Sequence, residues 1–197
     1  MTTVKKTEKK KHEHKHLNER SRLQVKYAEQ VYPELLKDFK NPMQVPTLKK
    51  VVISMGLAEA TKDKTSVTDC FRELALISGQ KPIITKSRKA IANFKLRLDQ
   101  DIGLKVTLRG KRMFDFFDRF VNIVCPRVRD FRGFNPKGFD GSGNYSCGLT
   151  EQVIFPEINP DDIKRSQGMN INFVTSAETD EDGRKLLKLL GLPFAAQ

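Results

Sequence analysis

Apolar residues recur at two different periods along the chain, and each period predicts a different kind of element. An amphipathic helix is predicted where they recur every four positions: Leu23, Tyr27, Val31, Leu35 and Phe39. Pro33 is expected to kink this helix or to begin its second half. Alternating or β-branched runs predict strands at 48–56, 82–85, 105–110, 151–155 and 169–176.

Three further helices are predicted from apolar stripes and from residues that start or stop helices. They cover about 66–77, with Gly79 as the stop, then 111–124, ended by Pro126, and 180–190, capped by Asp180 and ended by Gly191. Residues 126–148 are predicted to be a long loop that contains Gly, Phe and Arg, and 156–165 a turn.

These elements predict an α+β fold, a mostly antiparallel sheet covered by helices. Residues 1–20 are basic and nearly without apolar anchors, which predicts a disordered extension. Residues 21–197 are expected to form a single α+β domain that carries the long basic loop.

Charge is distributed unevenly within a net charge of +12. Residues 81–137 carry 15 Lys or Arg against 5 Asp or Glu, whereas residues 138–197 carry 5 against 9. A protein that is basic only for solubility does not need this asymmetry, so we infer a specific basic surface for an anionic partner such as nucleic acid. No apolar run approaches the roughly 20 residues of a membrane span, so a membrane is not expected among the partners.

The stretch "SGQKPIITKSRKAIANFKLR" (78–97) holds six Lys or Arg and no acid. It is either a solvated face or a surface for a polyanion, and the charge asymmetry favours the second interpretation. Gly79 and Pro82 disfavour a helix and predict a stiff, extended loop. In an extended chain Lys86 and Arg88 share one face, while Lys81 lies on the other.

Catalytic chemistry finds little support in the sequence. All three histidines lie between residues 12 and 16, within the predicted extension, so the remaining chain has no His for general-base catalysis. Cys70, Cys125 and Cys147 form no CxxC pair, and we expect reduced thiols and no metal site. "FDGSGNYSCG" (139–148) lacks the Gly-Lys-Ser/Thr ending of a phosphate-binding loop, so no cofactor is expected.

Aromatic residues in the loop 126–148 alternate with Arg and Lys, and two interpretations remain open. Phe131, Phe134, Phe139 and Tyr145 suit base stacking on RNA, and they suit equally a small hydrophobic cluster of the loop itself. Three functional classes compete: a structural rRNA-binding component, a small enzyme acting on phosphorylated or nucleic-acid substrates, and a non-ribosomal RNA chaperone or translation regulator.

Four long motifs resemble those of one family, in the same order and at the same spacing, from about Leu23 to Phe194. They are "ISGQKPIITKSRKAIANFKLR", "IGLKVTLRGKRMFDFFDRF", "PRVRDFRGFNPKGFDGSGNYSCGLTEQVIFPEI" and "TDEDGRKLLKLLGLPF". The family is the bacterial-type large-subunit ribosomal protein that binds 5S rRNA, the L-five family. The resemblance implies a non-catalytic protein of the central protuberance, located in cytoplasmic or organellar ribosomes.

The resemblance also implies partners: 5S rRNA, 23S rRNA, the elbow of the peptidyl-site tRNA, a small-subunit head protein reached through an intersubunit bridge, and other central-protuberance proteins. The residues that it assigns to rRNA are Lys49, Lys50, Ser54, Met55, Arg88, Lys89, Phe94 and Arg97. Those assigned to a loop near tRNA are Gln80, Lys81, Thr85 and Lys86. Those assigned to the bridge loop are Arg127, Arg129, Arg132 and Phe139.

The chain departs from the family pattern in three places. Family members often have Asn-Met-Gly where this chain has Ser54-Met55-Gly56, which removes one side-chain amide. Phe114 stands at a position often held by Trp, and the arm before Leu23 has no counterpart in the short members.

Overall fold

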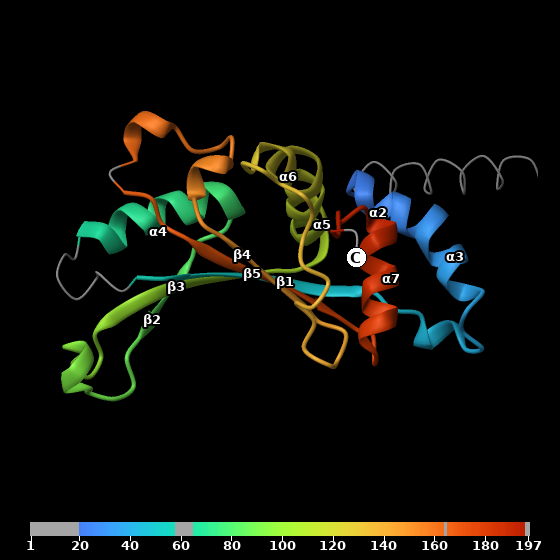
Figure 1. Cartoon of the computed structure of the whole chain (residues 1–197), viewed down its shortest axis with the longest axis horizontal. Helices are drawn as coiled ribbons and strands as arrows, with labels where there is room; N and C mark the ends of the chain where they lie inside the picture. The colour runs from blue at the N-terminus through green and yellow to red at the C-terminus, as the bar shows by residue number, and fades with distance from the viewer. Residues whose placement is uncertain (1–19, 58–64, 164, 196–197) are drawn as a thin grey trace, which may run out of the picture.

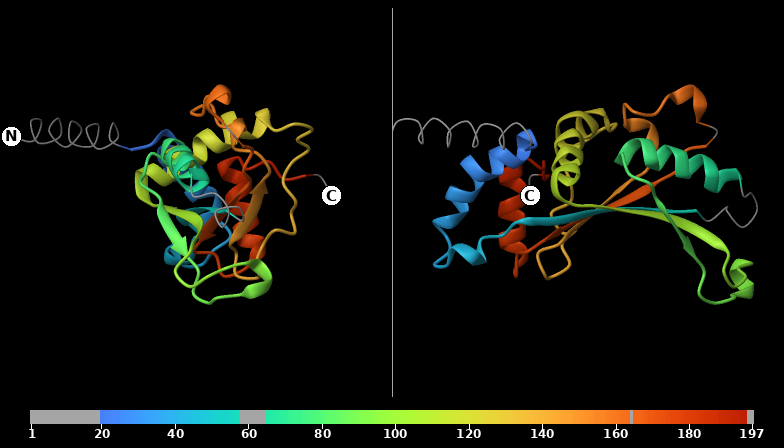
Figure 2. Two further views of the ribbon diagram at one scale, coloured as in Figure 1. Left: turned by 90° about the vertical axis from the view of Figure 1, so that its left-hand side faces the viewer. Right: turned by 180° about the vertical axis from the view of Figure 1, so that it is seen from behind.

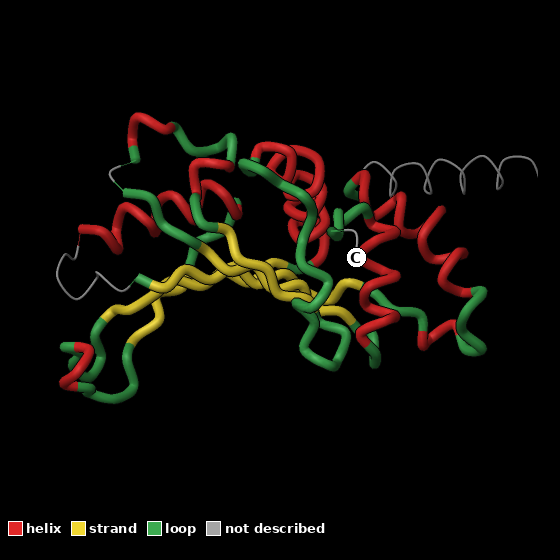
Figure 3. The backbone as a smooth tube through the Cα atoms, in the orientation of Figure 1, coloured by secondary structure: helices red, strands yellow, loops and turns green. Residues whose placement is uncertain are grey.

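One antiparallel sheet, in the strand order β2-β3-β1-β5-β4, organises the computed structural model, which describes residues 20–57, 65–163 and 165–195 (Figures 1 and 3). The strands are β1 (Leu48–Gly56), β2 (Ile83–Lys86), β3 (Asp101–Leu108), β4 (Tyr145–Leu149) and β5 (Met169–Thr175). With the helices, they confirm the predicted α+β class. The predicted disordered arm, apart from Arg20, lies outside the described residues.

The helices lie on one face and at one end of this sheet (Figures 1 and 2). They are α2 (Arg22–Lys26), α3 (Tyr32–Leu36), α4 (Thr65–Ser78), α5 (Gly110–Arg119), α6 (Cys125–Arg127) and α7 (Asp180–Leu190). Helix α4 contacts β3, and α5 contacts β1 and α2, while α7 packs against the turn that joins α2 to α3. The opposite face of the sheet carries no helix among the described residues (Figure 1).

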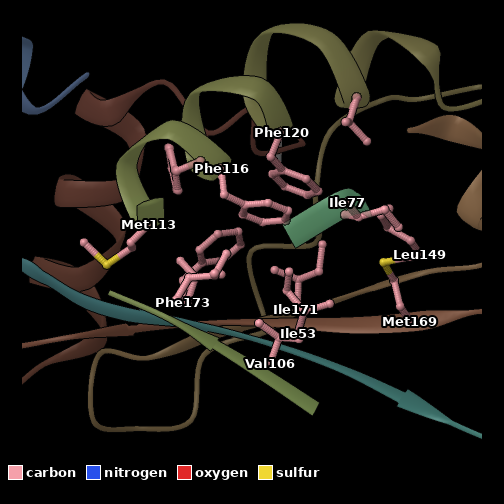
Figure 4. Close-up of a cluster of buried hydrophobic side chains, with 14 of the residues drawn as sticks. Ile53, Ile77, Val106, Met113, Phe116, Phe120, Leu149, Met169, Ile171 and Phe173 are labelled. Atoms are coloured by element: carbon pink, nitrogen blue, oxygen red, sulfur yellow. The ribbon is translucent and has the colours of Figure 1, made fainter. Parts of the chain in front are cut away.

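The alternation of side chains along β1 explains why the helices cover only one face. Val51, Ile53 and Met55 are buried, whereas the residues between them are only partly so. Successive side chains in a strand point to opposite faces, so one face of β1 is apolar and needs cover. The helical stripe predicted for 111–124 supplies that cover, because Phe117 lies edge-on to Phe173 of β5, with 5.2 Å between ring centroids. Figure 4 shows Phe116 and Phe120 of the same stretch on the side of the sheet that carries Phe173.

Both proline-containing helices pass through their proline by way of a π-helical turn. The turns span Tyr27–Val31 and Phe120–Val124, and the residue just after each donates its N–H to a carbonyl five residues back. Pro33 and Pro126 come next in the chain. A proline ring clashes with the carbonyl four residues back, and a widened turn moves that carbonyl away. The helix predicted for 111–124 therefore continues through Pro126 and ends at Arg127.

One strand prediction, one loop prediction and one cap prediction were wrong. Residues 151–155 contain a 3-10 turn, Gln152–Ile154, instead of a strand. One edge of the sheet is formed by β4, Tyr145–Leu149, which lies inside the predicted loop and whose Ser-Cys-Gly sequence gave no strand signal. Helix α7 is capped by Thr179, whose Oγ1 accepts from the N–H of Asp182. The carboxylate of Asp180 instead accepts from the backbone N–H groups of the 140–144 loop.

Gln152 explains why its segment leaves the sheet. Its side chain is 0% exposed, and its amide donates to the carbonyl of Arg165 at 2.6 Å and accepts from the N–H of Gln167. The same amide reaches the carboxylate of Glu73 on α4 at 3.4 Å. Buried polar groups need such partners, and an extended strand at 151–155 would take the amide away from them.

The C-terminal segment is pinned to the segment after α6 by backbone hydrogen bonds. Phe134 donates its N–H to the carbonyl of Pro193 at 2.8 Å, and its own carbonyl accepts from Ala195 at 3.0 Å. Gly133, at φ +105°, lies so close that a Cβ there would overlap the backbone of Ala195. Only glycine allows this close approach, so residue 133 helps to fix the position of the segment 193–195.

Replacing Gly133 with Ala is expected to lower the free energy of unfolding by about 3–5 kcal/mol, because strain at positive φ adds to a backbone clash. Gly141 is the matched control, since its φ is +88° but nothing lies within 4 Å of the place that a Cβ would take. Gly141→Ala should therefore cost only the backbone strain, about 1–2 kcal/mol. Urea unfolding of both variants measures the difference, and equal losses would contradict the close packing at residue 133.

Candidate nucleic-acid interface

The uncovered face of the sheet, called the open face below, is assembled from all five strands. Directly opposed residues in antiparallel strands share a face, so the pairing register identifies its members. One row crosses the sheet through Gly148, Asn170, Ser54, Lys105 and Ile83. A second row contains Ser146, Asn172, Val52 and Thr107, and a third pairs Lys50 with Val174.

The open face carries hydroxyl, amide and ammonium groups with little negative charge. Among the described strand residues, alternation assigns only one acid to it, Asp101, at the far end of β3. Asn170 and Lys105 are exposed, and Ser54 is half-buried. Hydroxyl, amide and ammonium donors are the groups that contact phosphate and sugar oxygens of RNA. The open face therefore fits a polyanion laid across the strands.

Strands β2 and β3 form a hairpin whose tip, residues 87–100, projects beyond the sheet (Figure 1). Ser87 anchors the tip: it is 5% exposed, its N–H donates to the carbonyl of Gln100 at 2.8 Å, and its Oγ donates to the carbonyl of Arg97. The N–H of Gln100 returns a bond to Ser87 Oγ at 3.2 Å. These bonds close the base of the tip and hold its outer residues in place.

Large apolar side chains are exposed on this hairpin among its cations. Phe94 is 70% exposed, Leu98 63% and Ile83 69%. The basic residues around them are exposed or partly exposed: Arg88, Lys89, Lys95 and Arg97. Exposed apolar groups gathered in one place indicate an interaction surface, and their mixture with cations suits RNA.

The predicted residues near tRNA do not lie together. Gln80 donates its side-chain amide to the carbonyl of Thr107 at 3.2 Å, which places Gln80 and Lys81 beside the last residues of β3. Lys86 pairs with Asp101, at the opposite end of β3. At about 3.4 Å per residue, these two ends are roughly 20 Å apart. Only Lys86 and its neighbour Thr85 lie close to the tip.

Two other predicted residues point inward. Met55 is 2% exposed and belongs to the core, so its side chain is not available to rRNA. Phe139 is half-buried, with its ring centroid 4.8 Å from Tyr145 and 6.0 Å from Phe194. Together with Phe134, which stacks on Phe120 at 5.6 Å, this packing supports the hydrophobic-cluster interpretation of the loop aromatics.

The remaining predicted cations are accessible. Three arginines are exposed at the end of α6 and just after it: Arg127, Arg129 and Arg132. Lys49 is exposed at the start of β1, where the pairing with β5 is irregular. The structure therefore leaves these side chains free to reach a partner, and it separates the α6 segment from the hairpin (Figure 1).

Several open-face residues were not predicted from the sequence: Lys105, Thr107, Ser146, Asn170 and Asn172. A signal was present in "MNINFVT", where two Asn alternate with buried apolar residues. Alternation alone does not say whether a polar face meets solvent or RNA, and the register that aligns these residues is a tertiary property.

The described residues show none of the usual catalytic arrangements. Within 20–57, 65–163 and 165–195, no three His, Cys, Asp or Glu side chains are grouped as metal ligands are. Burial raises the pKa of the Cys70 thiol to about 11 and the pKa of the Cys125 thiol to about 12, so neither is a ready thiolate nucleophile. No described helix is both long enough and apolar enough to cross a membrane.

Comparison with known proteins agrees with this surface. The profile described as "Ribosomal protein L5" matches residues 41–97, and the profile of the C-terminal part of the same ribosomal family matches residues 101–194. The large ribosomal subunit protein uL5 of Protochlamydia amoebophila is 66% identical over 176 residues, which cover 88% of this chain and 95% of the relative. The chain belongs to the ribosomal protein L5 family.

Other members of the L5 family show similar coverage. The uL5 protein of Thermosipho africanus is 55% identical over 87% of this chain and 96% of its own length. That of Anaeromyxobacter sp. (strain Fw109-5) is 54% identical over 88% of this chain and 98% of its own length. As an L5 protein, the chain is a structural, non-enzymatic constituent of the large ribosomal subunit that associates with rRNA.

Replacing Ser87 with Ala is expected to loosen the hairpin tip without unfolding the sheet. The change removes the side-chain bonds to Arg97 and Gln100, worth about 1–2 kcal/mol together. Hydrogen exchange of the Gln100 amide should speed up about tenfold, while the Ile53 amide in β1 keeps its rate. Ser142→Ala, at an exposed position of the 140–144 loop, is the control. Unchanged exchange at Gln100 in the Ser87→Ala chain would show that Ser87 does not anchor the tip.

Proposed function

We propose that this L5 protein binds 5S rRNA through the open face of its sheet, and binds 23S rRNA through the cations that flank that face. The single observation that carries the proposal is the composition of the open face. Among the described residues, helices cover only the other side of the sheet, and the open side offers Lys50, Ser54, Lys105 and two Asn in aligned rows. Such a rigid set of donors suits the phosphates and 2′-hydroxyls of a folded RNA.

The hairpin tip is the part of the interface that reaches away from the sheet. A projecting element suits a partner outside the rRNA bound to the open face, and the family resemblance implies a loop near the peptidyl-site tRNA. The tRNA contact is therefore placed at Lys86 and the tip rather than at Gln80 and Lys81. This moves Arg88, Lys89, Phe94 and Arg97 from the predicted rRNA group to the tRNA group.

The end of α6 and the segment after it are proposed to carry the bridge to the small-subunit head. Arg127, Arg129 and Arg132 are exposed there, while the aromatic rings of the same segment pack inward. The packed rings hold the backbone, and the exposed guanidinium groups remain available to an acidic or RNA partner. In this proposal the arginines contact the partner, and the packing of Phe139 positions them.

Replacing Lys50 and Lys105 together with Ala tests the open face. If both ammonium groups contact phosphate, the affinity for 5S rRNA should fall at least about tenfold. The slope of log affinity against log salt should become shallower by about 1.4–1.8, since each of the two contacts contributes about 0.7–0.9. Filter binding at several salt concentrations measures both values.

Lys37→Ala with Lys111→Ala is the matched control, because it removes the same charge from exposed positions outside the sheet. The control should leave the salt slope within experimental error of the unchanged chain. An open-face variant that binds 5S rRNA as tightly as the control, with the same slope, would place the RNA elsewhere.

Replacing Arg88 and Lys89 with Ala distinguishes tRNA contact from rRNA contact at the tip. We expect the affinity for 5S rRNA to change less than about twofold, because the tip lies beyond the open face. Dissociation of peptidyl-site tRNA from ribosomes assembled with the variant should accelerate. The reverse pattern, a large loss of 5S rRNA affinity with normal tRNA retention, would return the tip to the rRNA interface. Lys81→Ala, at the other end of β3, is the control.

A further inference from the structure

A groove lies between the outer surface of α7 and the C-terminal segment 192–195, and it belongs neither to the open face nor to the hairpin. Its volume is about 720 Å³, and its lining includes Arg184, Lys188, Leu192, Pro193 and Phe194. Pockets for small organic ligands have volumes of about 300–1,000 Å³. None of the lining residues belongs to a strand, so this α7 groove is a separate feature of the surface.

One wall of the α7 groove is held rigidly. The two backbone bonds between Phe134 and the segment 193–195 fix its course, and the backbone of Gly133 lies close against Phe194 and Ala195. The ring of Phe194 is edge-on to Tyr145, with 5.3 Å between centroids. A preformed wall of this kind loses little entropy when a ligand binds.

The charges and rings of the α7 groove indicate the chemistry of its ligand. The guanidinium carbon of Arg184 lies over the ring of Phe194, 5.9 Å from its centroid, an arrangement that presents a planar cation stacked on an aromatic ring. Lys188 follows Arg184 by one helical turn, and neither forms an ion pair within the described residues. Lys185 is partly neutralised by Asp38 at 3.6 Å, and Glu181 is the acid of the lining. The lining therefore carries a net positive charge next to the apolar side chains of the segment 192–194.

An extended peptide is a poor fit to this groove. Peptides that bind along a chain segment use its free N–H and C=O groups. Pro193 has no N–H, its carbonyl already accepts from Phe134, and the N–H of Ala195 already donates to Phe134. A flat, negatively charged ligand has no need of those groups. A nucleotide combines a planar base with a phosphate and so matches both parts of the groove.

We propose that the α7 groove binds one unpaired nucleotide of an RNA strand, with the base against Phe194 and Arg184 and the adjoining phosphate near Lys188. The inference rests on the proposed function only in taking RNA as the partner, and it adds a second RNA site that the open face does not include. In an assembled subunit, such a site would hold an rRNA base that is turned out of its helix. Together with the contact at the open face, it would fix the orientation of the protein on the rRNA.

The test uses the full chain and a hexanucleotide RNA of uridines with one central 2-aminopurine, whose fluorescence falls on stacking. Binding should quench the probe, and Arg184→Ala with Lys188→Ala should weaken affinity about fivefold or more. Phe194→Leu should remove the quenching while keeping the salt slope, since it takes away no charge. Lys188→Glu provides a second change at an exposed position, and thermal unfolding confirms that each variant is folded.

The outcomes separate the α7 groove from the open face. Quenching that persists in the Lys50→Ala, Lys105→Ala chain and is lost in the groove variants supports the proposal. Quenching lost in the open-face variant and retained in the groove variants overturns it, while the proposed function stands. An abasic probe that binds as tightly as the 2-aminopurine probe also overturns it, because no base then enters the groove. Loss of 5S rRNA binding by the groove variants alone would instead refute the proposed function of the open face.

Discussion

The difference between the two faces of β1 determines where the helices pack and which face of the sheet stays open. Val51, Ile53 and Met55 form an apolar face in the middle of the sheet, and water must be excluded from it. The aromatic stripe of α5 and the apolar side of α4 cover that face, and their burial fixes the register of the neighbouring strands. Because the register is fixed, Lys50 and Ser54 are held on the other face, beside Val174 and Asn170 of β5.

The positions of the exposed surfaces thus depend on buried residues next to them. The hairpin tip stands where β2 and β3 leave the sheet, and the buried hydroxyl of Ser87 joins its two sides. The C-terminal segment is held by its backbone hydrogen bonds to Phe134, and the ring of Phe134 stacks on Phe120 of the helical layer. The tip and the C-terminal segment are therefore attached to the core at different residues, and a substitution at one attachment should move one of these surfaces without the other.

The sequence predicted the regular parts of this fold well and its junctions poorly. Strand β1, strand β5 and helix α4 were placed within a few residues, because their apolar periodicity is strong. Strand β4 was missed since its place at the edge of the sheet depends on pairing with β5, not on its own propensity. The segment 151–155 has a strand-like composition, but the buried amide of Gln152 directs it elsewhere. For the interface, the basic block was visible in the sequence, whereas the burial of Met55 and the alignment of Asn170 with Ser54 required the register.

Lysine acetylation of the chain, free and bound to 5S rRNA, reports which ammonium groups the RNA covers. We expect 5S rRNA to slow modification of Lys50 and Lys105 on the open face several-fold, while Lys37 and Lys111, which lie outside the sheet, react at the rate of the free chain. Unchanged modification of Lys50 and Lys105 in a saturated complex, with protection at Lys37 or Lys111 instead, would contradict the proposed RNA contact at the open face.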